Sequence, residues 1–160
     1  MPYPGLGTGF AGLVVPGGVI PALPALSRDA ALLALAGAAA GLLDVPSVLI
    51  AEQLQAREAK GSTAFGRGAA IPHAHLAGLA RCCVLLARLP QPVDWQASDG
   101  EAVDVAVLLL SPRDAGADHL KALARISRTL RDSDAMAQLR QAQSVPAMLA
   151  AVTIEAAAAA

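Results

Sequence analysis

The sequence predicts a single layered α/β domain. Two almost entirely apolar runs, Cys82–Leu89 and Val103–Leu110, are typical of strands buried on both faces of a sheet. After them, apolar residues recur at helical spacing, so strands alternate with helices along the chain. The chain has 160 residues, of which 55% are hydrophobic and only 2% aromatic, enough for one core of Leu, Val, Ile and Ala.

The expected domain covers most of the chain. Residues 1–12 are rich in Gly and Pro and are expected to form a flexible N-terminus. Residues 13–154 are expected to form the domain itself, beginning with a turn and a short extended piece up to Ile20. Residues 155–160, a glutamate followed by alanines, are expected to be a low-complexity tail.

Two helices are expected in the first half of the chain. Ser27 is expected to cap a helix that is apolar almost all round, which favours burial, and that ends near Leu43. Asp44 is expected to cap a second helix, with Pro46 in its first turn and its end near Lys60.

Short strands and turns are expected around the two long apolar runs. Ala69–Ile71 is predicted to be a strand that Pro72 stops, because proline cannot donate a hydrogen bond to a sheet. Residues 90–92 (Pro-Gln-Pro) are expected to turn the chain, and Val93–Trp95 to add a short edge strand.

Three helices are expected to close the chain. One begins near Asp118 with apolar residues at helical spacing, and one spans Ser133–Gln141 with Ser133 as its cap. Ser144, with a proline as second helical residue, is expected to open the last helix, which ends near Val152.

Composition narrows the class of partner and the compartment. The formal net charge is −1 and no basic run exists, so nucleic acid is not an expected partner, because neutralising phosphates requires clustered Lys and Arg. The uncharged run Ala30–Leu43 has 14 residues, short of the about 20 that a membrane-spanning helix needs. Cys82 and Cys83 are adjacent and are not expected to pair, as in a reducing compartment. A soluble cytoplasmic protein without membrane insertion is expected.

The strongest chemical signal is the stretch from Arg57 to His73. His73 follows a predicted strand and a proline, and α/β proteins usually place reactive groups at strand ends. Upstream, a glycine-rich loop carries the hydroxyls of Ser62 and Thr63, and Arg57 ends the helix before it. An arginine, a loop rich in hydroxyls and a histidine can together hold and transfer a phosphoryl group. The imidazole would need one free ring nitrogen, while the other donates to a carbonyl and so sets the tautomer.

The pattern Arg-Glu-x-x-Gly-Ser-Thr-x-x-Gly-x-Gly-x-Ala-Ile-Pro-His-Ala, from residues 57 to 74, resembles the active-site signature of IIA domains of the bacterial phosphotransferase system. The resemblance lies with the mannitol/fructose type, in particular its nitrogen-regulatory branch, and covers about residues 14–150. It implies a mixed, mostly parallel sheet with helices on both faces. It also implies His73 as phosphoryl acceptor, an HPr-like phosphocarrier (NPr) as donor, and a regulatory target or a IIB domain as acceptor, with no cofactor.

The resemblance implies roles for further residues, and each role has a structural alternative. His119 would lie beside the phosphoryl group and donate to one of its oxygens, or it is only a histidine at a helix start. Arg57 would bind the phosphoryl oxygens in a planar fork, or it forms a surface salt bridge. Ser62 and Thr63 would bind the phosphate, or they only shape the loop.

Other chemistries fit the sequence less well. His73-x-His75 on an extended segment, with His119, would supply three imidazoles for zinc, but no cysteine or carboxylate completes the set and no metal is expected. Lys60 precedes Gly61 instead of following a glycine, so the loop is not a P-loop. Gly66-x-Gly68 without a suitably placed acidic residue does not indicate a dinucleotide site.

Three functions remain open from the sequence. The first is a phosphohistidine carrier, with an apolar docking face around His73 formed by Phe65, Ile71 and Leu76. The second is a regulatory protein whose partners respond to the added charge at His73. The third is a fructose- or mannitol-specific IIA component that passes its phosphate to a IIB domain.

Overall fold

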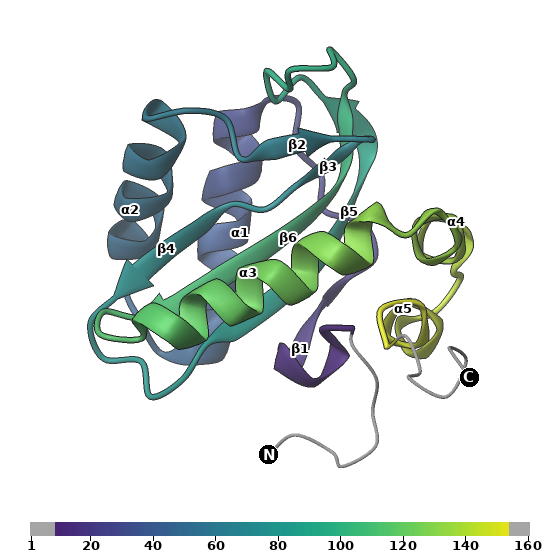
Figure 1. The fold of residues 1–160 in the computed structure, drawn as a ribbon. Helices are drawn as coiled ribbons and strands as arrows, with labels where there is room; N and C mark the ends of the chain where they lie inside the picture. The colour runs from purple at the N-terminus through teal and green to yellow at the C-terminus, as the bar shows by residue number, and fades with distance from the viewer. Residues whose placement is uncertain (1–8, 154–160) are drawn as a thin grey trace.

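The computed structural model describes residues 9–153, which form one six-stranded sheet with helices on both faces (Figure 1). Five strands follow the order β1-β5-β6-β3-β2, and β4 also pairs with β6. The strands are β1 (Val14–Ile20), β2 (Ala64–Gly66), β3 (Ala69–Ala70), β4 (His73–Leu76), β5 (Cys83–Val93) and β6 (Val103–Pro112). The central strand β6 therefore has every other strand except β1 and β2 beside it.

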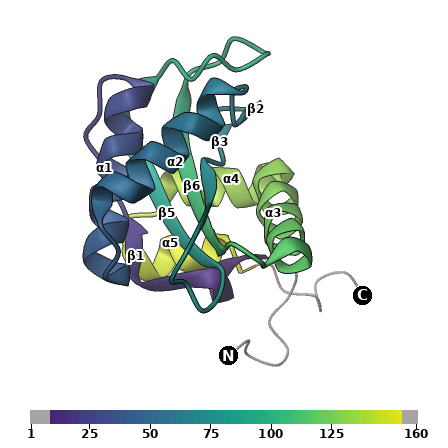
Figure 2. The same cartoon turned by 90° about the vertical axis from the view of Figure 1, so that its left-hand side faces the viewer.

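The helices form two layers, one on each face of the sheet (Figure 2). Each layer has its own apolar core. They are α1 (Arg28–Leu43), α2 (Ser47–Ala59), α3 (Gly116–Arg131), α4 (Ser133–Gln141) and α5 (Val145–Ala151), with a 3₁₀ turn at Ala11–Leu13. Helices α1 and α2 pack on one face around the buried Trp95. Helices α3, α4 and α5 cover the other face, where Phe10 and Ile126 are fully buried.

The sheet is mixed, as predicted. The pairs β1–β5, β3–β6 and β4–β6 are parallel, whereas β5–β6 and β2–β3 are antiparallel. Strands β5 and β6 are buried along most of their length, because helices cover both of their faces. The predicted α/β fold class is thus confirmed, and the two apolar runs are neighbouring strands at its centre.

The N-terminal segment differs from its prediction. Val14–Ile20 is one strand instead of a turn and a short extended piece, because Gly17 adopts a positive φ of 79° and lets the strand pass an irregularity. Part of the segment expected to be flexible packs on the domain: Phe10 is fully buried and its backbone N–H donates to the carbonyl of Val152. Residues 1–8 and the predicted tail 155–160 lie outside the described residues.

Two predicted helix caps are wrong. Asp44 does not cap α2 but ends α1 in a left-handed conformation, with φ 56°. The cap of α4 is Asp132 instead of Ser133, and its carboxylate accepts from two backbone N–H groups. Ser27 and Ser144 are the predicted caps, each accepting from a backbone N–H three residues on.

Strand β5 is longer than predicted. Pro90 and Pro92 do not turn the chain, because they lie in an irregularity of the β5–β6 ladder between Arg88 and Val93, where the missing N–H groups are not needed. Trp95 lies beyond the strand and is fully buried in the core under α1 and α2. No helix among residues 9–153 is long and apolar enough to cross a membrane.

The β3–β4 edge positions the residues of interest. Both short strands pair in parallel with β6, and Ile71-Pro72 interrupts them. The interruption is still bonded to the sheet, because the N–H of Leu109 donates to the carbonyl of Pro72. His73 is consequently the first residue of β4 and pairs in register with Leu109.

Candidate functional site

His73 is half-buried and is the first residue of β4, the strand that lies between α2 and α3 in Figure 1. Its Nδ1 is 2.7 Å from the carbonyl oxygen of Ile71. Since a carbonyl can only accept, Nδ1 carries a proton and donates it. The neutral ring then has its free lone pair on Nε2. The sequence predicted such a carbonyl partner, and the structure places it on the residue two positions upstream.

Arg57, in the last turn of α2, addresses the other nitrogen of this ring. Its Nε donates to Nε2 of His73 at 3.1 Å, and its Nη1 donates to the carbonyl of Gly61 at 2.8 Å. Burial lowers the pKa of His73, and the positive charge of Arg57 lowers this pKa further, against the opposing effect of the Ile71 carbonyl. Both hydrogen bonds and the lowered pKa therefore describe a neutral imidazole with one defined tautomer.

His119 enters the site from the first turns of α3. Its side chain is buried, and its ring centroid lies 5.5 Å from that of His73. Nδ1 of His119 is 2.7 Å from Oγ of Ser111 on β6. Burial lowers the pKa of His119 to about 4, with smaller contributions from His75 and His73. At neutral pH this second imidazole is uncharged as well.

His75 brings a third imidazole to the same place. Its ring centroid lies 4.1 Å from that of His119, with the planes tilted by 36°. Within residues 9–153, no group of three His, Cys, Asp or Glu side chains is arranged to hold a metal ion. The rings of His73, His75 and His119 form a cluster instead, in which the exposed His75 packs against His119.

The two loop hydroxyls are bonded to the protein. Ser62 Oγ donates to the carbonyl of Trp95 at 2.7 Å and accepts from the N–H of Ala64. Thr63 is buried, and its hydroxyl donates to the carboxylate of Glu58. Both side chains border the cleft beside His73, and their contacts support the loop-shaping alternative.

Glu58 is the residue that sequence reasoning left without a role. Only 5% of it is exposed, yet its carboxylate accepts from Thr63 N–H at 3.1 Å, from the Thr63 hydroxyl and from Trp95 Nε1 at 3.1 Å. Arg28 on α1 lies 3.9 Å away. This network joins the end of α2, the loop and the segment after β5. Its only signal in the sequence was the position of Glu58 inside the motif.

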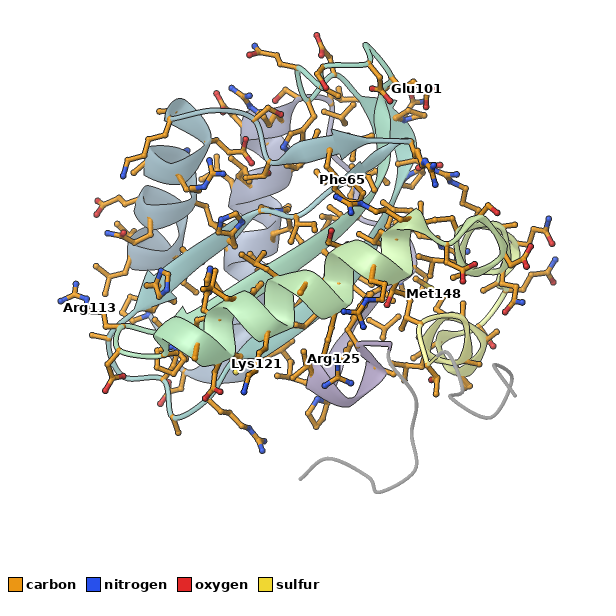
Figure 3. All side chains as sticks on the ribbon, viewed as in Figure 1. Phe65, Glu101, Arg113, Lys121, Arg125 and Met148 are labelled. Atoms are coloured by element: carbon orange, nitrogen blue, oxygen red, sulfur yellow. The ribbon has the colours of Figure 1, made fainter. Side chains whose placement is uncertain are left out.

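A cleft of about 350 Å³ opens beside His73. Its walls come from three parts of the chain: the end of α2 with the loop, strand β2, and α3. Figure 3 shows Phe65 on β2, on the side that faces α3. Among the lining residues are Arg57, Phe65, Ile71, His73, Leu123, Ala124 and Ser127.

The cleft corrects the predicted docking face. Phe65 is half-exposed at the cleft, and Ile71 lines it although only 6% of Ile71 is exposed. The prediction that Leu76 belongs to this docking face is wrong, because its side chain packs in the core under α1 and α2 and is only 5% exposed. Strand alternation places Leu76 and His73 on opposite faces. The sequence offered no sign that Leu123 and Ala124 form the opposite wall.

Comparisons with known proteins match most of this chain. Residues 27–153 match the family described as "Phosphoenolpyruvate-dependent sugar phosphotransferase system, EIIA 2". A nitrogen regulatory protein of Bradyrhizobium diazoefficiens is 45% identical over 142 residues, covering 89% of this chain and 93% of that protein. A 2-O-alpha-mannosyl-D-glycerate-specific EIIABC component of Escherichia coli is 34% identical over 129 residues, 79% of this chain but 20% of that protein.

A solved structure shows the same fold. The nitrogen regulatory protein IIA-Ntr of Neisseria meningitidis superposes with a TM-score of 0.84 at 24% sequence identity. The superposition covers 90% of this chain and 99% of that one. At this identity the likeness concerns the arrangement of helices and strands.

Proposed function

Because this chain belongs to the EIIA 2 family of the phosphoenolpyruvate-dependent sugar phosphotransferase system, a family of phosphoryl transfer, we propose that it carries a phosphoryl group on Nε2 of His73. The resemblance first drawn from the motif of residues 57–74 is confirmed by this membership. The observation that carries the proposal is the pair of hydrogen bonds that identifies Nε2 as the unprotonated nitrogen of a neutral imidazole.

The transfer step follows from this tautomer. In the resting protein Arg57 covers the Nε2 lone pair, so the guanidinium has to move from the nitrogen to the oxygens of the incoming group. The donor is expected to carry the group on a histidine: a phosphorus–nitrogen bond forms at Nε2 of His73 while the bond between phosphorus and the donor's histidine nitrogen breaks, and that nitrogen keeps the electron pair. The proton stays on Nδ1, which donates it to the Ile71 carbonyl, and this hydrogen bond stabilises the positive charge of the phosphorylated ring.

Two side chains are suited to bind the transferred oxygens. Arg57 offers charge-assisted hydrogen bonds from the α2 side, where its Nε already lies 3.1 Å from Nε2 of His73. His119 offers a neutral ring from the α3 side, 5.5 Å from the His73 ring. Since such a transition state needs little covalent help, positioning and electrostatic support supply most of the catalysis.

The proposed donor is an HPr-like phosphocarrier (NPr), and the cleft supports docking of a protein. Phe65 and Leu123 give it apolar walls beside the reacting nitrogen, as small transient interfaces require. Phosphoenolpyruvate, the origin of the group, is a cytoplasmic metabolite, so the proposal implies a cytoplasmic location.

The nitrogen-regulatory interpretation is favoured over sugar uptake. The nitrogen regulatory protein of Bradyrhizobium diazoefficiens is 45% identical over 89% of this chain, whereas the 2-O-alpha-mannosyl-D-glycerate-specific EIIABC component is 34% identical over 79% of it. We therefore propose that regulatory partners bind according to the phosphorylation state of His73, because added charge changes the surface of the cleft. Transfer to a IIB domain remains the alternative output.

The acceptor is tested by phosphotransfer. The chain is incubated with phosphoenolpyruvate, enzyme I and an HPr-like carrier, and its mass is measured. The native chain should gain one phosphoryl group, His73→Ala should gain none, and the matched His75→Ala variant should gain one. Equal labelling of His73→Ala would remove His73 as the acceptor.

The regulatory output is tested by partner capture. Native chain and the charge mimic His73→Asp are compared as baits, with His75→Asp as the matched control on the same strand. We expect partners that differ between His73→Asp and the other two baits. Identical partners for all three would contradict regulation by phosphorylation state.

A further inference from the structure

A buried hydroxyl lies behind the second imidazole. Ser111 on β6 is fully buried, and its Oγ is 2.7 Å from Nδ1 of His119. On its other side, Sγ of Cys82 lies 3.4 Å from the same oxygen. Ser111 also pairs in register with His75 of β4. Strand β6, helix α3 and the residue before β5 thus meet at this hydroxyl, and β4 is the neighbouring strand.

The protons of this chain of groups can be counted. A serine hydroxyl has one proton to donate, and its two lone pairs accept. If Cys82 donates to Ser111, the hydroxyl proton goes to Nδ1 of His119. In the reverse arrangement, Nδ1–H would donate to Ser111 and the hydroxyl would donate to sulfur. A neutral imidazole nitrogen accepts far better than a thiol sulfur, and the contact of 2.7 Å is the short one.

We propose that Ser111 is a positioning residue that donates to Nδ1 of His119 and thereby holds His119 as the tautomer protonated on Nε2. This inference rests on the proposed phosphoryl transfer, since the Nε2–H group would donate to an oxygen of the phosphoryl group on His73. In both imidazoles the Nδ1 partner then decides the role of Nε2. The Ile71 carbonyl accepts the Nδ1 proton of His73, so Nε2 of that ring is an unprotonated nucleophile. The Ser111 hydroxyl donates to Nδ1 of His119, so Nε2 of that ring carries the proton and is a hydrogen-bond donor.

The surroundings of His119 agree with a neutral donor. Its Nε2 makes no hydrogen bond within residues 9–153, and in that part of the chain no fully buried side-chain nitrogen or oxygen lacks a partner. Nε2 is therefore not sealed in the core. The titratable groups beside the ring are His73 and His75 from β4, and Cys82, from the segment before β5, contacts Ser111. The lowered pKa of about 4 keeps the ring uncharged at neutral pH.

A neutral donor suits a carrier that must also release its group. It gives one hydrogen bond to an oxygen without adding a positive charge, whereas an imidazolium would hold the dianionic phosphoryl group more tightly. Arg57 already supplies a permanent charge on the opposite side. By keeping His119 a neutral donor, Ser111 would help the site to accept the phosphoryl group without holding it too tightly to pass it on.

The direct test needs no variant. Nitrogen-15 NMR of the histidine side chains in the native chain at neutral pH reports which ring nitrogen of His119 carries the proton. We expect Nε2–H on His119 and the opposite tautomer, Nδ1–H, on His73. A His119 protonated on Nδ1 would overturn the inference about Ser111 while leaving the phosphate acceptor untouched.

A variant pair tests the consequence for transfer. Ser111→Ala should admit a population of His119 protonated on Nδ1, raise the pKa of that ring, and slow transfer to His73 by roughly threefold to tenfold. Cys82→Ala, which keeps the Ser111 hydroxyl, should change the rate by less than about twofold. Equal loss in both variants, or an unchanged tautomer and rate in Ser111→Ala, would contradict the proposal. Labelling of His73→Ala would instead contradict the proposed function.

Discussion

The two sides of His73 are built from different chemistry. The α2 side is ionic: Arg57 is a permanent cation, and the buried Glu58 is bonded to Thr63 and Trp95. The α3 side of the site is uncharged: His119 is neutral and buried, and its neighbours on the cleft wall, Leu123 and Ala124, are apolar. One face of the sheet therefore supplies charge, and the other supplies a neutral hydrogen-bond donor and the apolar side chains of Leu123 and Ala124.

This difference indicates how the chain manages charge around a dianionic group. On the α2 side the charges are fixed by hydrogen bonds to the loop, so changing them should disturb the fold as well as the reaction. On the α3 side the absence of charge results from burial, so it should fail when acid protonates the ring or when a carboxylate is introduced. Four changes test the two sides, and the expected effect, expressed as a free energy, decreases from the first change to the last.

The largest effect is expected from Glu58→Ala. The change leaves the Thr63 N–H, the Thr63 hydroxyl and Trp95 Nε1–H facing an apolar methyl group, so the free energy of unfolding should fall by roughly 3–5 kcal/mol. Urea unfolding measures this loss in the free energy of unfolding. Glu52→Ala, on the exposed face of the same helix, should change the value by less than about 0.5 kcal/mol. Equal midpoints for the two variants would show that the network does not support the loop.

Acid should weaken the α3 side. The folded-state pKa of His119 is about 4, whereas the unfolded chain titrates near pH 6.5, so the unfolded state binds more protons between these values. The free energy of unfolding should therefore fall as pH drops from about 6.5 to about 4, by roughly 3 kcal/mol from this group. His73, whose pKa is also lowered, adds in the same direction.

Urea titrations at several pH values test this expectation. His119→Gln, which cannot be protonated, should flatten the dependence over that range. A native chain as stable at pH 5 as at pH 7 would mean that His119 is accessible to solvent and ionises normally.

Arg57→Ala should slow phosphotransfer on the order of a hundredfold. It removes the guanidinium that addresses the reacting nitrogen and the oxygens expected there. The rate of transfer from the phosphorylated donor is measured by rapid quench. Lys60→Ala, an exposed cation at the same helix end, serves as the control and should leave the rate within about twofold. Similar losses in both variants would reduce Arg57 to a source of general positive potential.

The smallest effect concerns the cleft wall. Ala124→Glu places a carboxylate beside the phosphorylated donor and should raise KM for the donor by about fivefold, with an unfolding free energy within about 0.5 kcal/mol of native. Ala137→Glu on the exposed face of α4 should leave KM unchanged. A KM raised equally by both would point to net charge instead of the wall.

The sequence could predict much of the α2 side of the site and little of the α3 side. Arg57, the loop hydroxyls and His73 lie within 17 consecutive residues, so a local motif could identify them together. The loop's other supports come from afar: Trp95 approaches Glu58 from 37 residues away. Leu123 and Ala124 belong to a helix whose distance from His73 no local pattern reports. Leu76 was misplaced for a different reason, because strand alternation starting from His73 already puts its side chain on the opposite face of β4.

The sequence by itself determined the elements and the chemistry: alternating apolar runs and helical spacing, one histidine behind a proline, and an arginine within reach through a short loop. Those features depend on neighbouring residues and on intrinsic preferences. The tertiary structure alone decided which groups are hydrogen-bonded to one another and which ring nitrogens carry protons. The carbonyl beside His73, the hydroxyl beside His119 and the buried carboxylate of Glu58 act at distances that are set only when the sheet has folded. Burial changes the pKa of a ring only after the layers have packed on both faces.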